Sequence, residues 1–552
     1  MTAPDSAIDE PSGAHWRHAR TGDTEVWLTG HVRGREAAVL ASELDASAFE
    51  DAVAAGAWVR GLDGHFALLA RGSGWALGAV DRVRSTPLFY AAAGRSTVGA
   101  DADAVRRQLG LSRSDIDCDA ALSVGMCGYT IGDRTLYASL RQLRAGEVIL
   151  LRSGRDAETV RYASYRPWLA PADGDERRLE QELLDVTRLV LERLVESVEG
   201  RTIVVPLSAG LDSRLIVSGL AALGHRDVRC FAYGQPGNYE VAASRAIAEQ
   251  LGYPWRFLPL TRRAQRATFS SAEHAAYLQF ADSLSSVPFE QDLGAVLRLR
   301  EEGWLPPDSV IVNGNTGDYL SGNHVPPALG VPLPPDASPR EREDRVLELL
   351  LAKHARLWTS LATPEHDAVL AAMVRREWQL ADVVLSGSAS DHGAFEAAEL
   401  IDRQCKYVIS GQRVYEFLGF DWRLPLWDTH YLDFWERVPV GSKIGQRLYR
   451  TTLVNANWGG VWESEPAVFT TPRWVVPAVK IARAAHGLRP RRPWPEVERR
   501  WFNYWTDLVN NHAVVPWRTV VSDRRGHRNA ISWHAAAYLA SKGLDIDGSD
   551  LT

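Results

Sequence analysis

The chain has 552 residues, a net charge of −7 and 24% charged residues, so no excess of basic residues indicates nucleic-acid binding. Its apolar runs are too short to cross a membrane, and its first residues lack the charged start and apolar stretch of a signal peptide. Four cysteines stand far apart without CxxC spacing, which argues against a disulfide framework or a zinc site and favours the cytoplasm. A chain of this length predicts two domains.

The first part of the chain predicts a β-rich domain over residues 1–165. Short apolar runs alternate there with Gly, Asp and Pro, a pattern typical of strands separated by turns. The clearest runs are EVWLTGHVRG (25–34), GHFALLARG (64–72), WALGAVD (75–81), PLFYAAAG (87–94) and EVILLRSG (147–154). The segment 162–178 is expected to link this domain to the next.

From residue 180 the pattern changes, and it predicts an α/β domain over residues 180–552. An amphipathic stretch that ends at Gly200 predicts a long helix. Continuous apolar runs predict buried strands at TIVVPL (202–207), DVRCFAYG (227–234) and SVIVNG (309–314). Helical patterns follow the first two runs, and such alternation is typical of a parallel sheet covered on both faces. Residues 325–400 combine a Pro-rich stretch with charged helices and are expected to form an insertion or a lid.

The loop after the first of these strands predicts an anion site. In SAGLDS (208–213), small residues, two hydroxyls and one carboxylate stand between strand and helix. Backbone N–H groups and the helix dipole favour an anion at such a turn, and Gly210 permits its close approach. Asp212 would repel a bare phosphate, so its presence indicates a divalent metal. The loop is not a Walker motif, and a plain turn that caps the helix is the structural alternative.

A second Gly-rich loop, NGNTGDY (313–319), follows another predicted strand and carries one carboxylate, Asp318. Parallel sheets bind ligands at the carboxyl ends of their strands. We therefore expect Asp212 and Asp318 to share one Mg²⁺ and a pyrophosphate group.

Taken in order, these loops and two later segments resemble the asparagine synthetase family. The loops are similar to the family's Ser-Gly-Gly-x-Asp-Ser and Ser-Gly-x-Gly-x-Asp-Glu sequences, and GFDWRLPLWD (419–428) and SKIGQRLYR (442–450) are similar to two later family segments. In the N-terminal half, LDGHFALLARGSGWALGAVDRVRSTPLFYA (62–91) and GDRTLYASLRQLRAGEVI (132–149) also resemble the family. The resemblance therefore covers nearly the whole chain.

The resemblance implies an Ntn-hydrolase-like (class II glutaminase-like) β-rich sandwich, followed by a parallel-sheet synthetase domain of the adenine-nucleotide α-hydrolase type. It implies a C–N ligase that uses ATP and Mg²⁺, adenylates a carboxylate and couples it to an amine, releasing AMP and pyrophosphate. Thr2 stands where the family's glutaminase has its cysteine, so we expect a glutamine-independent enzyme of specialised metabolism. Its partners would be a small-molecule or peptide carboxylate and an amine donor, and a homodimer is left open.

The resemblance also implies roles for single residues. Those implied to hold the nucleotide and its phosphates are Leu207, Ser208, Gly210, Asp212, Ser213, Tyr233 and Gly314, and the implied metal ligands are Asp212 and Asp318. Lys443 would neutralise charge on the α-phosphate, Asp421 would help to deprotonate the amine, and Arg413 occupies a basic position of the family pattern. An ordinary surface lysine, and a salt bridge of Asp421 with Arg423 or Arg413, are the structural alternatives.

Two other functions stay open. One is an intramolecular lactam or macrolactam cyclase, as in the related β-lactam synthetases and lasso-peptide cyclases. Asn315 stands where asparagine synthetases carry Glu, which argues against asparagine as the product. The other is a catalytically silent scaffold that binds nucleotide, suggested by Ala209, Asn315 and the missing cysteine. The two loop carboxylates and Lys443 argue instead for catalysis.

Overall fold

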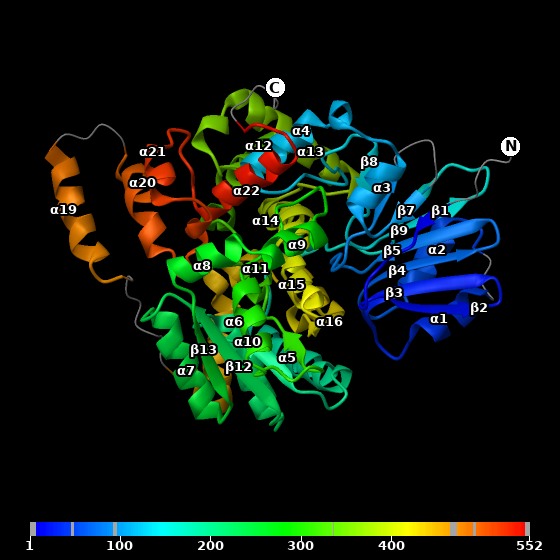
Figure 1. The fold of residues 1–552 in the computed structure, drawn as a ribbon, viewed down its shortest axis with the longest axis horizontal. Helices are drawn as coiled ribbons and strands as arrows, with labels where there is room; N and C mark the ends of the chain where they lie inside the picture. Colours follow the sequence, from blue (N-terminus) through cyan, green and yellow to red (C-terminus); the bar gives the residue numbers. More distant parts are fainter. Residues whose placement is uncertain are drawn as a thin grey trace.

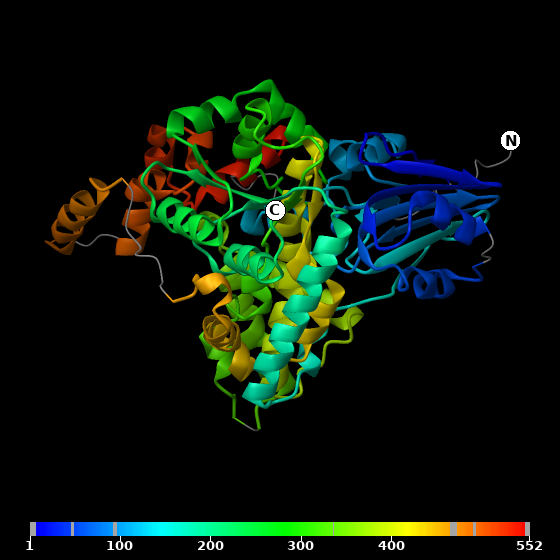
Figure 2. The same cartoon turned by 90° about the horizontal axis from the view of Figure 1, so that it is seen from below.

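A computed structural model of the chain describes residues 7–45, 49–91, 97–334, 336–463, 472–488 and 493–546. Figures 1 and 2 show a β-rich part at one end, a central part built around a second kind of sheet, and a helical part at the other end. Helix α19 (Val475–Leu488) projects from that far end in both views. None of the described helices is both long enough and apolar enough to cross a membrane.

The β-rich part consists of two stacked sheets. The antiparallel six-stranded sheet has the order β10-β9-β5-β4-β3-β2, with strands β2 (Arg17–Thr21), β3 (Thr24–Val32), β4 (Gly64–Gly72), β5 (Trp75–Val80), β9 (Glu147–Arg152) and β10 (Glu158–Arg161). The four-stranded sheet has the order β1-β7-β6-β8, with strands β1 (Ala7–Asp9), β6 (Phe89–Ala91), β7 (Thr97–Gly99) and β8 (Leu140–Gln142). The five strand runs predicted from the sequence are all present as strands of these sheets.

Alternation along the strands explains why the sheets stack. Successive side chains of a strand point to opposite faces. In β4, Leu69 therefore packs between the two sheets, whereas Leu68 packs under the helices that cover the outer face. Those helices are α1 (Ala37–Asp45) and α2 (Ala52–Val59), while α3 (Ala102–Gln108) packs on the four-stranded sheet. The result is a four-layered arrangement of helices, two sheets and helices.

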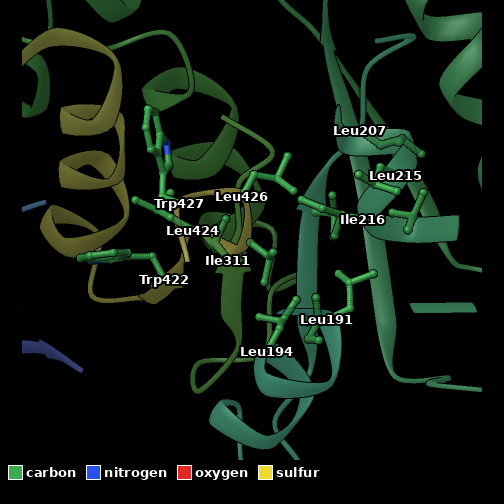
Figure 3. Close-up of a cluster of buried hydrophobic side chains, with 14 of the residues drawn as sticks. Leu191, Leu194, Leu207, Leu215, Ile216, Ile311, Trp422, Leu424, Leu426 and Trp427 are labelled. Atoms are coloured by element: carbon green, nitrogen blue, oxygen red, sulfur yellow. The ribbon is translucent and has the colours of Figure 1, made fainter. Parts of the chain in front are cut away.

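The central sheet is parallel throughout, with the order β13-β12-β11-β14-β15. Its strands are β11 (Ile203–Pro206), β12 (Val228–Gly234), β13 (Trp255–Pro259), β14 (Val310–Val312) and β15 (Asp421–Arg423). One apolar core joins the sheet to α5 (Glu176–Ser197), α6 (Leu211–Ala222), α7 (Tyr239–Leu251) and α10 (Leu293–Glu301). Figure 3 shows Leu191 and Leu194 of α5 in this core with Ile216 of α6 and Ile311 of β14. Because β11 and β14 are parallel neighbours, the loops that follow them emerge at the same edge.

The helices of the segment expected to form an insertion or a lid share a hydrophobic core with helices from other parts of the chain. These are α12 (Pro339–His354), α13 (Pro364–Leu380) and α14 (Ser388–Glu399). Their buried side chains, such as Trp378 and Phe395, pack in one cluster with α4 (Cys118–Cys127) and α22 (Ala530–Ser541). The segment expected to be a linker is also packed, because Tyr165 and Trp168 are buried. The sequence analysis missed this because only a few of that segment's residues are apolar.

The remaining helices connect these parts. They are α8 (Arg262–Phe269), α9 (Ala272–Phe280), α11 (Gly317–Leu320), the π-helix η5 (Leu400–Val408), α15 (Arg413–Phe417), α16 (Thr429–Glu436), α17 (Val440–Lys443), α18 (Arg447–Ala456), α20 (Trp494–Thr506) and α21 (Trp517–Ser522).

A buried carboxylate, Glu290, ties α9 to α22. It bonds to the Nε2 atom of His274, and its Oε1 atom lies 2.7 Å from the Nδ1 atom of His534. Burial raises the pKa of Glu290, but the two histidines more than offset this and lower it to about 2. Burial lowers the pKa of His534, and the Glu290 carboxylate raises it above its usual value.

We expect the cluster of Glu290, His274 and His534 to stabilise the fold over a limited range of pH. The stabilisation that Glu290 contributes is present above its unfolded pKa of about 4.3 and is lost as the pH falls toward 2. The stabilisation that His534 contributes is present below its unfolded pKa of about 6.5 and is lost as the pH rises through its raised pKa in the folded state. We expect Glu290→Gln to lower the Tm most between about pH 4.5 and 6.5. Melting curves followed by circular dichroism measure this effect.

Glu348→Gln is the matched control, because Glu348 is exposed on α12. A Tm loss in Glu290→Gln that is the same at every pH would contradict the electrostatic account.

Candidate active site

The first loop of the site joins β11 to α6. Gly210 precedes the helix and has no side chain to cap it, so the first N–H groups of the twelve-residue helix α6 are not bonded by a cap. The Ser208 N–H donates to Ser213 Oγ at 3.1 Å, and the Gly210 N–H donates to Ser208 Oγ at 3.1 Å. These hydrogen bonds hold the loop residues Ser208 and Gly210 against the first turn of α6. Uncapped N–H groups and the helix dipole make this end of α6 suitable for an anion.

The second loop, after β14, touches the first. The Asp318 N–H donates to Asp212 Oδ2 at 2.9 Å, and the Tyr449 hydroxyl bonds to Asp212 Oδ1 at 3.0 Å. Two glycines permit this approach. A Cβ atom at Gly314 would lie 2.9 Å from a backbone nitrogen of the first loop, and a Cβ atom at Gly317 would lie 2.7 Å from Asp212 Oδ1. Larger residues at either position would push the loops apart.

Both loops line one cavity of about 390 Å³. The residues of the cavity that the sequence analysis implicated are Ser208, Gly210, Asp212, Ser213, Tyr233, Gly314 and Asp318. Leu207 is not among the lining residues, because its side chain is buried in the core and its N–H donates to the Phe231 carbonyl. The structure thus brings together seven of the eight residues predicted to hold nucleotide or metal.

The structure adds polar residues to which the sequence analysis gave no role, although some of them lie in the motifs it quoted. These are Gln291, Asp292, Asn313, Asn323, Gln446 and Arg450. Asp292 accepts hydrogen bonds from the hydroxyls of Tyr233 and Tyr415. Burial raises the pKa of Asp292, although both phenols lower it. These residues come from four separate segments, so spacing along the chain could not have found them.

The two loop carboxylates differ in their electrostatics. Burial, and then the neighbouring Asp318, raise the pKa of Asp212 to about 8. Burial also raises the pKa of Asp318, but the His324 side chain outweighs this and lowers it. His324 Nε2 lies 3.2 Å from Asp318 Oδ2, and the Nδ1 atom of the same ring bonds to the fully buried Glu399. His324 therefore holds the Asp318 carboxylate in place, a role that the sequence analysis missed.

This pair suits Mg²⁺, which takes one or two protein carboxylates and fills its other positions with phosphate oxygens and water. Within the described ranges, no group of three or more His, Cys, Asp or Glu residues is placed to hold a metal by itself. The mutual repulsion that raises the pKa of Asp212 would be relieved by a cation between the two carboxylates.

Lys443 does not lie in this cavity. Its ammonium is fully buried, 2.7 Å from Glu396 Oε2 and 3.2 Å from the Tyr165 hydroxyl. Neither a contact with the α-phosphate nor an ordinary surface position fits this placement. The resemblance of 442–450 to a family segment carries no information about a partner of Lys443 on α14.

Asp421 and Arg413 also lie outside the cavity. Asp421 begins β15 and stands opposite Val310, the first residue of β14, so it lies at the amino edge of the sheet. It is half exposed and forms an ion pair with Arg201 at 2.5 Å. Arg413 pairs with Glu416 and stacks 4.2 Å from the ring centre of Phe280. The predicted catalytic roles of Asp421 and Arg413 are therefore corrected to structural ones.

A comparison of the sequence with models of known protein families gives a match that includes the first loop. Residues 188–288 match the family model described as asparagine synthase, over a range that runs from α5 past β11, the first loop, β12 and β13. This part of the chain is therefore similar to the asparagine synthase family. The class that this match defines is an ATP-dependent, amide-forming synthetase, a ligase of C–N bonds.

No curated protein matches the chain. Among solved structures, a glutamine phosphoribosylpyrophosphate amidotransferase from B. subtilis complexed with ADP and GMP is 12% identical, with 44% of this chain and 73% of that chain covered and a TM-score of 0.19. A structure of the allosteric regulatory enzyme of purine biosynthesis is 11% identical, with 44% and 62% covered and a TM-score of 0.18. Scores this low carry no argument about this chain.

Contact between the loops predicts the effect of enlarging Gly317. In Gly317→Ala the new methyl would meet Asp212 Oδ1 and separate the carboxylates, so we expect binding of Mn²⁺, as a spectroscopic substitute for Mg²⁺, to weaken about tenfold. Electron paramagnetic resonance titration measures free Mn²⁺ directly. Gly441→Ala is the control, since a Cβ atom there meets nothing within 4 Å. Equal affinities in the two variants would contradict the role given to Gly317.

Burial of the Lys443–Glu396 pair predicts a loss of stability in Lys443→Ala. The variant leaves the Glu396 carboxylate buried without its cation, which costs about 3 kcal/mol or more. Urea unfolding measures that loss. The double variant Lys443→Met with Glu396→Leu should recover much of it, because neither buried charge remains. Unchanged stability in Lys443→Ala would show that Lys443 is not held in this pair.

Proposed function

We propose that this chain is an ATP-dependent synthetase that activates a substrate carboxylate as an acyl-adenylate and couples it to an amine. The observation that carries the proposal is the meeting of Asp212 and Asp318 from two loops, in one cavity, beside the uncapped start of α6. The site would bind ATP with Mg²⁺, and the metal would supply positive charge to the departing pyrophosphate.

The residues of the cavity suit this reaction in distinct ways. Ser208, Ser213 and the N–H groups at the start of α6 would hold the pyrophosphate, and Asp212 and Asp318 would hold the metal. Tyr233 and Gly314 are proposed to contact the nucleoside. Arg450 lines the cavity, so we give it the role first expected of Lys443, neutralising charge on the α-phosphate.

The chemistry proceeds in two steps. A substrate carboxylate oxygen attacks the α-phosphorus, the bond to the bridging oxygen breaks, and pyrophosphate leaves. The amine nitrogen then attacks the acyl carbon, gives up a proton, and AMP leaves with the bonding electrons. Asp292 is the third carboxylate that lines the cavity, so we propose it in place of Asp421 as the proton acceptor.

We further propose that the amine does not come from glutamine. The four-layered β-rich part supports an Ntn-hydrolase-like domain at residues 1–165, followed by a synthetase domain at 180–552 with an insertion at about 325–400. Thr2 lies outside the described residues. The cysteines of the β-rich part lie on α4, and burial raises the pKa of Cys127, so that thiol is not an activated nucleophile. The substrates would be small-molecule or peptide carboxylates and amines of specialised metabolism.

A pyrophosphate-release assay with Mg²⁺, ATP and a pool of amino acids, sugar acids and short peptides tests the proposal. Asp212→Asn and Asp318→Asn should each lower the rate about 100-fold or more, because each removes a metal ligand and charge stabilisation. Asp344→Asn is the control, since Asp344 is an exposed residue of α12 paired with Arg375.

The outcomes separate the alternatives. Release only with substrates that carry their own amine would identify an intramolecular cyclase. Rates in the Asp212 and Asp318 variants equal to that of the wild type would contradict the proposal. No release with any carboxylate, together with binding of a non-hydrolysable ATP analogue, would identify a silent scaffold.

A further inference from the structure

A second cavity, of about 200 Å³, lies among the C-terminal helices and shares no residue with the site described above. It is bounded by η4 (Thr359–Leu361), by α20 and by the segment between α21 and α22. Figure 1 shows α20 and α21 side by side. Four arginines line it, together with two carboxylates: Arg499, Arg500, Arg524, Arg525, Glu496 and Asp523. The lining therefore carries an excess of positive charge.

Two of the four guanidinium groups already have partners. Arg525 donates from Nε and Nη2 to Asp523 Oδ2 at 3.0 and 2.8 Å, and Arg500 donates from Nε to the Val521 carbonyl at 2.7 Å. Among the described residues, the side chains of Arg499 and Arg524 form no ion pair. Glu496 lines the same cavity but is not within ion-pairing distance of either guanidinium group.

A buried histidine also faces the cavity. His527 is only 4% exposed and lines the cavity, and its Nε2 atom has no hydrogen-bond partner in the described part of the chain. Burial and then neighbouring charges, including that of Arg499, lower the pKa of His527 to about 4. Burial and then Arg499 also lower the pKa of Arg528. Burial is the largest cause of both shifts; His512 is the largest charge that lowers the pKa of His527, and Arg499 contributes to both. The Nε2 atom of His527 is thus left for a ligand or a water molecule.

The cavity is formed in advance of any ligand. The N–H groups of Thr359 and Ser360 donate to the carbonyls of Gly526 and Arg525, both at 2.9 Å. Gly526 has φ +78°, and a Cβ atom there would lie 2.8 Å from Thr359 Oγ1, so this close contact requires glycine. The Arg525 guanidinium stacks 4.5 Å from the ring centre of Trp358. The segment that carries three of the lining charges is thus fixed against η4.

We propose that this cavity is a binding site for a small phosphate-bearing anion. Arg499 and Arg524 would bind its oxygens, and His527 Nε2 would share a hydrogen bond with it. Donors come from α20, from residues 523–527 and from the Ser360 hydroxyl of η4, whereas the Thr359 hydroxyl already donates to the Gly526 carbonyl at 3.0 Å. Donors on three sides suit a tetrahedral oxyanion better than a planar carboxylate. The volume lies below the range of cavities that enclose larger ligands, so the anion is a phosphate or a small phosphate monoester.

Isothermal titration of the full chain with inorganic phosphate tests this proposal. Because the nucleotide cavity would also take phosphate, the titration is repeated after adding Mg²⁺ and α,β-methylene-ATP. We expect Arg499→Ala and Arg524→Ala each to weaken phosphate binding about tenfold, and His527→Asn to weaken it less. Arg518→Ala is the matched control, since Arg518 is an exposed arginine of α21 outside the cavity.

Titrations with other ligands identify the source of the phosphate group. Tighter binding of glycerol phosphate than of inorganic phosphate would indicate a phosphorylated small molecule, and equal binding would indicate the free ion. Three results would overturn the proposal: no binding at millimolar phosphate, equal affinity in Arg499→Ala, Arg524→Ala and Arg518→Ala, or succinate binding as tightly as phosphate. Because the arginine variants leave the nucleotide cavity intact, failure here leaves the proposed synthetase reaction untouched.

Discussion

The hydrogen bond from the Asp318 N–H to the Asp212 carboxylate joins two loops that lie 106 residues apart in the chain. It also brings two carboxylates together in a partly buried cavity, which is unfavourable while both are charged. The pKa of Asp212, raised to about 8, records this cost. The fold supports the arrangement because β11 and β14 are buried neighbours in the parallel sheet. We propose that a site held in this state binds a cation, and with it an anionic ligand, more strongly than either loop would alone.

The parts of this fold that could be predicted from sequence are those with uninterrupted apolar runs. The residues of β11 and β14 are almost all fully buried, so a continuous apolar pattern marked both strands. Strand β15 gave no such signal, because a single apolar residue, Trp422, stands between Asp421 and Arg423. Its strand character comes from pairing with β14, and Arg423 is held by the Ser197 carbonyl. Tertiary contacts of this kind produce no periodic pattern of apolar residues in the sequence.

The residues of the candidate site can likewise be separated into those that the sequence predicted and those that only the folded structure reveals. The composition of the two loops, together with the family resemblance, predicted Asp212 and Asp318, and the structure places both residues in one cavity. The roles of Lys443 and Asp421 were wrong because position in a motif reveals neither the edge of the sheet nor a buried partner. Glu396, the partner of Lys443, lies 47 residues away on α14. Arg450 and Asp292 entered the site only through the folded structure.

The contact between the β-rich part and the helices explains why that part is kept in a chain for which we propose no glutamine chemistry. Lys406 of η5 is fully buried, and its ammonium donates to the carbonyls of Thr130 and Gly132, both at 2.6 Å. Arg144 of the β-rich part bonds Glu377 of α13 through two guanidinium nitrogens, at 2.8 and 2.9 Å. Buried charges that lose their partners destabilise a fold strongly. The buried charges of η5 and α13 therefore depend on the β-rich part for their partners, whether or not that part performs a reaction of its own.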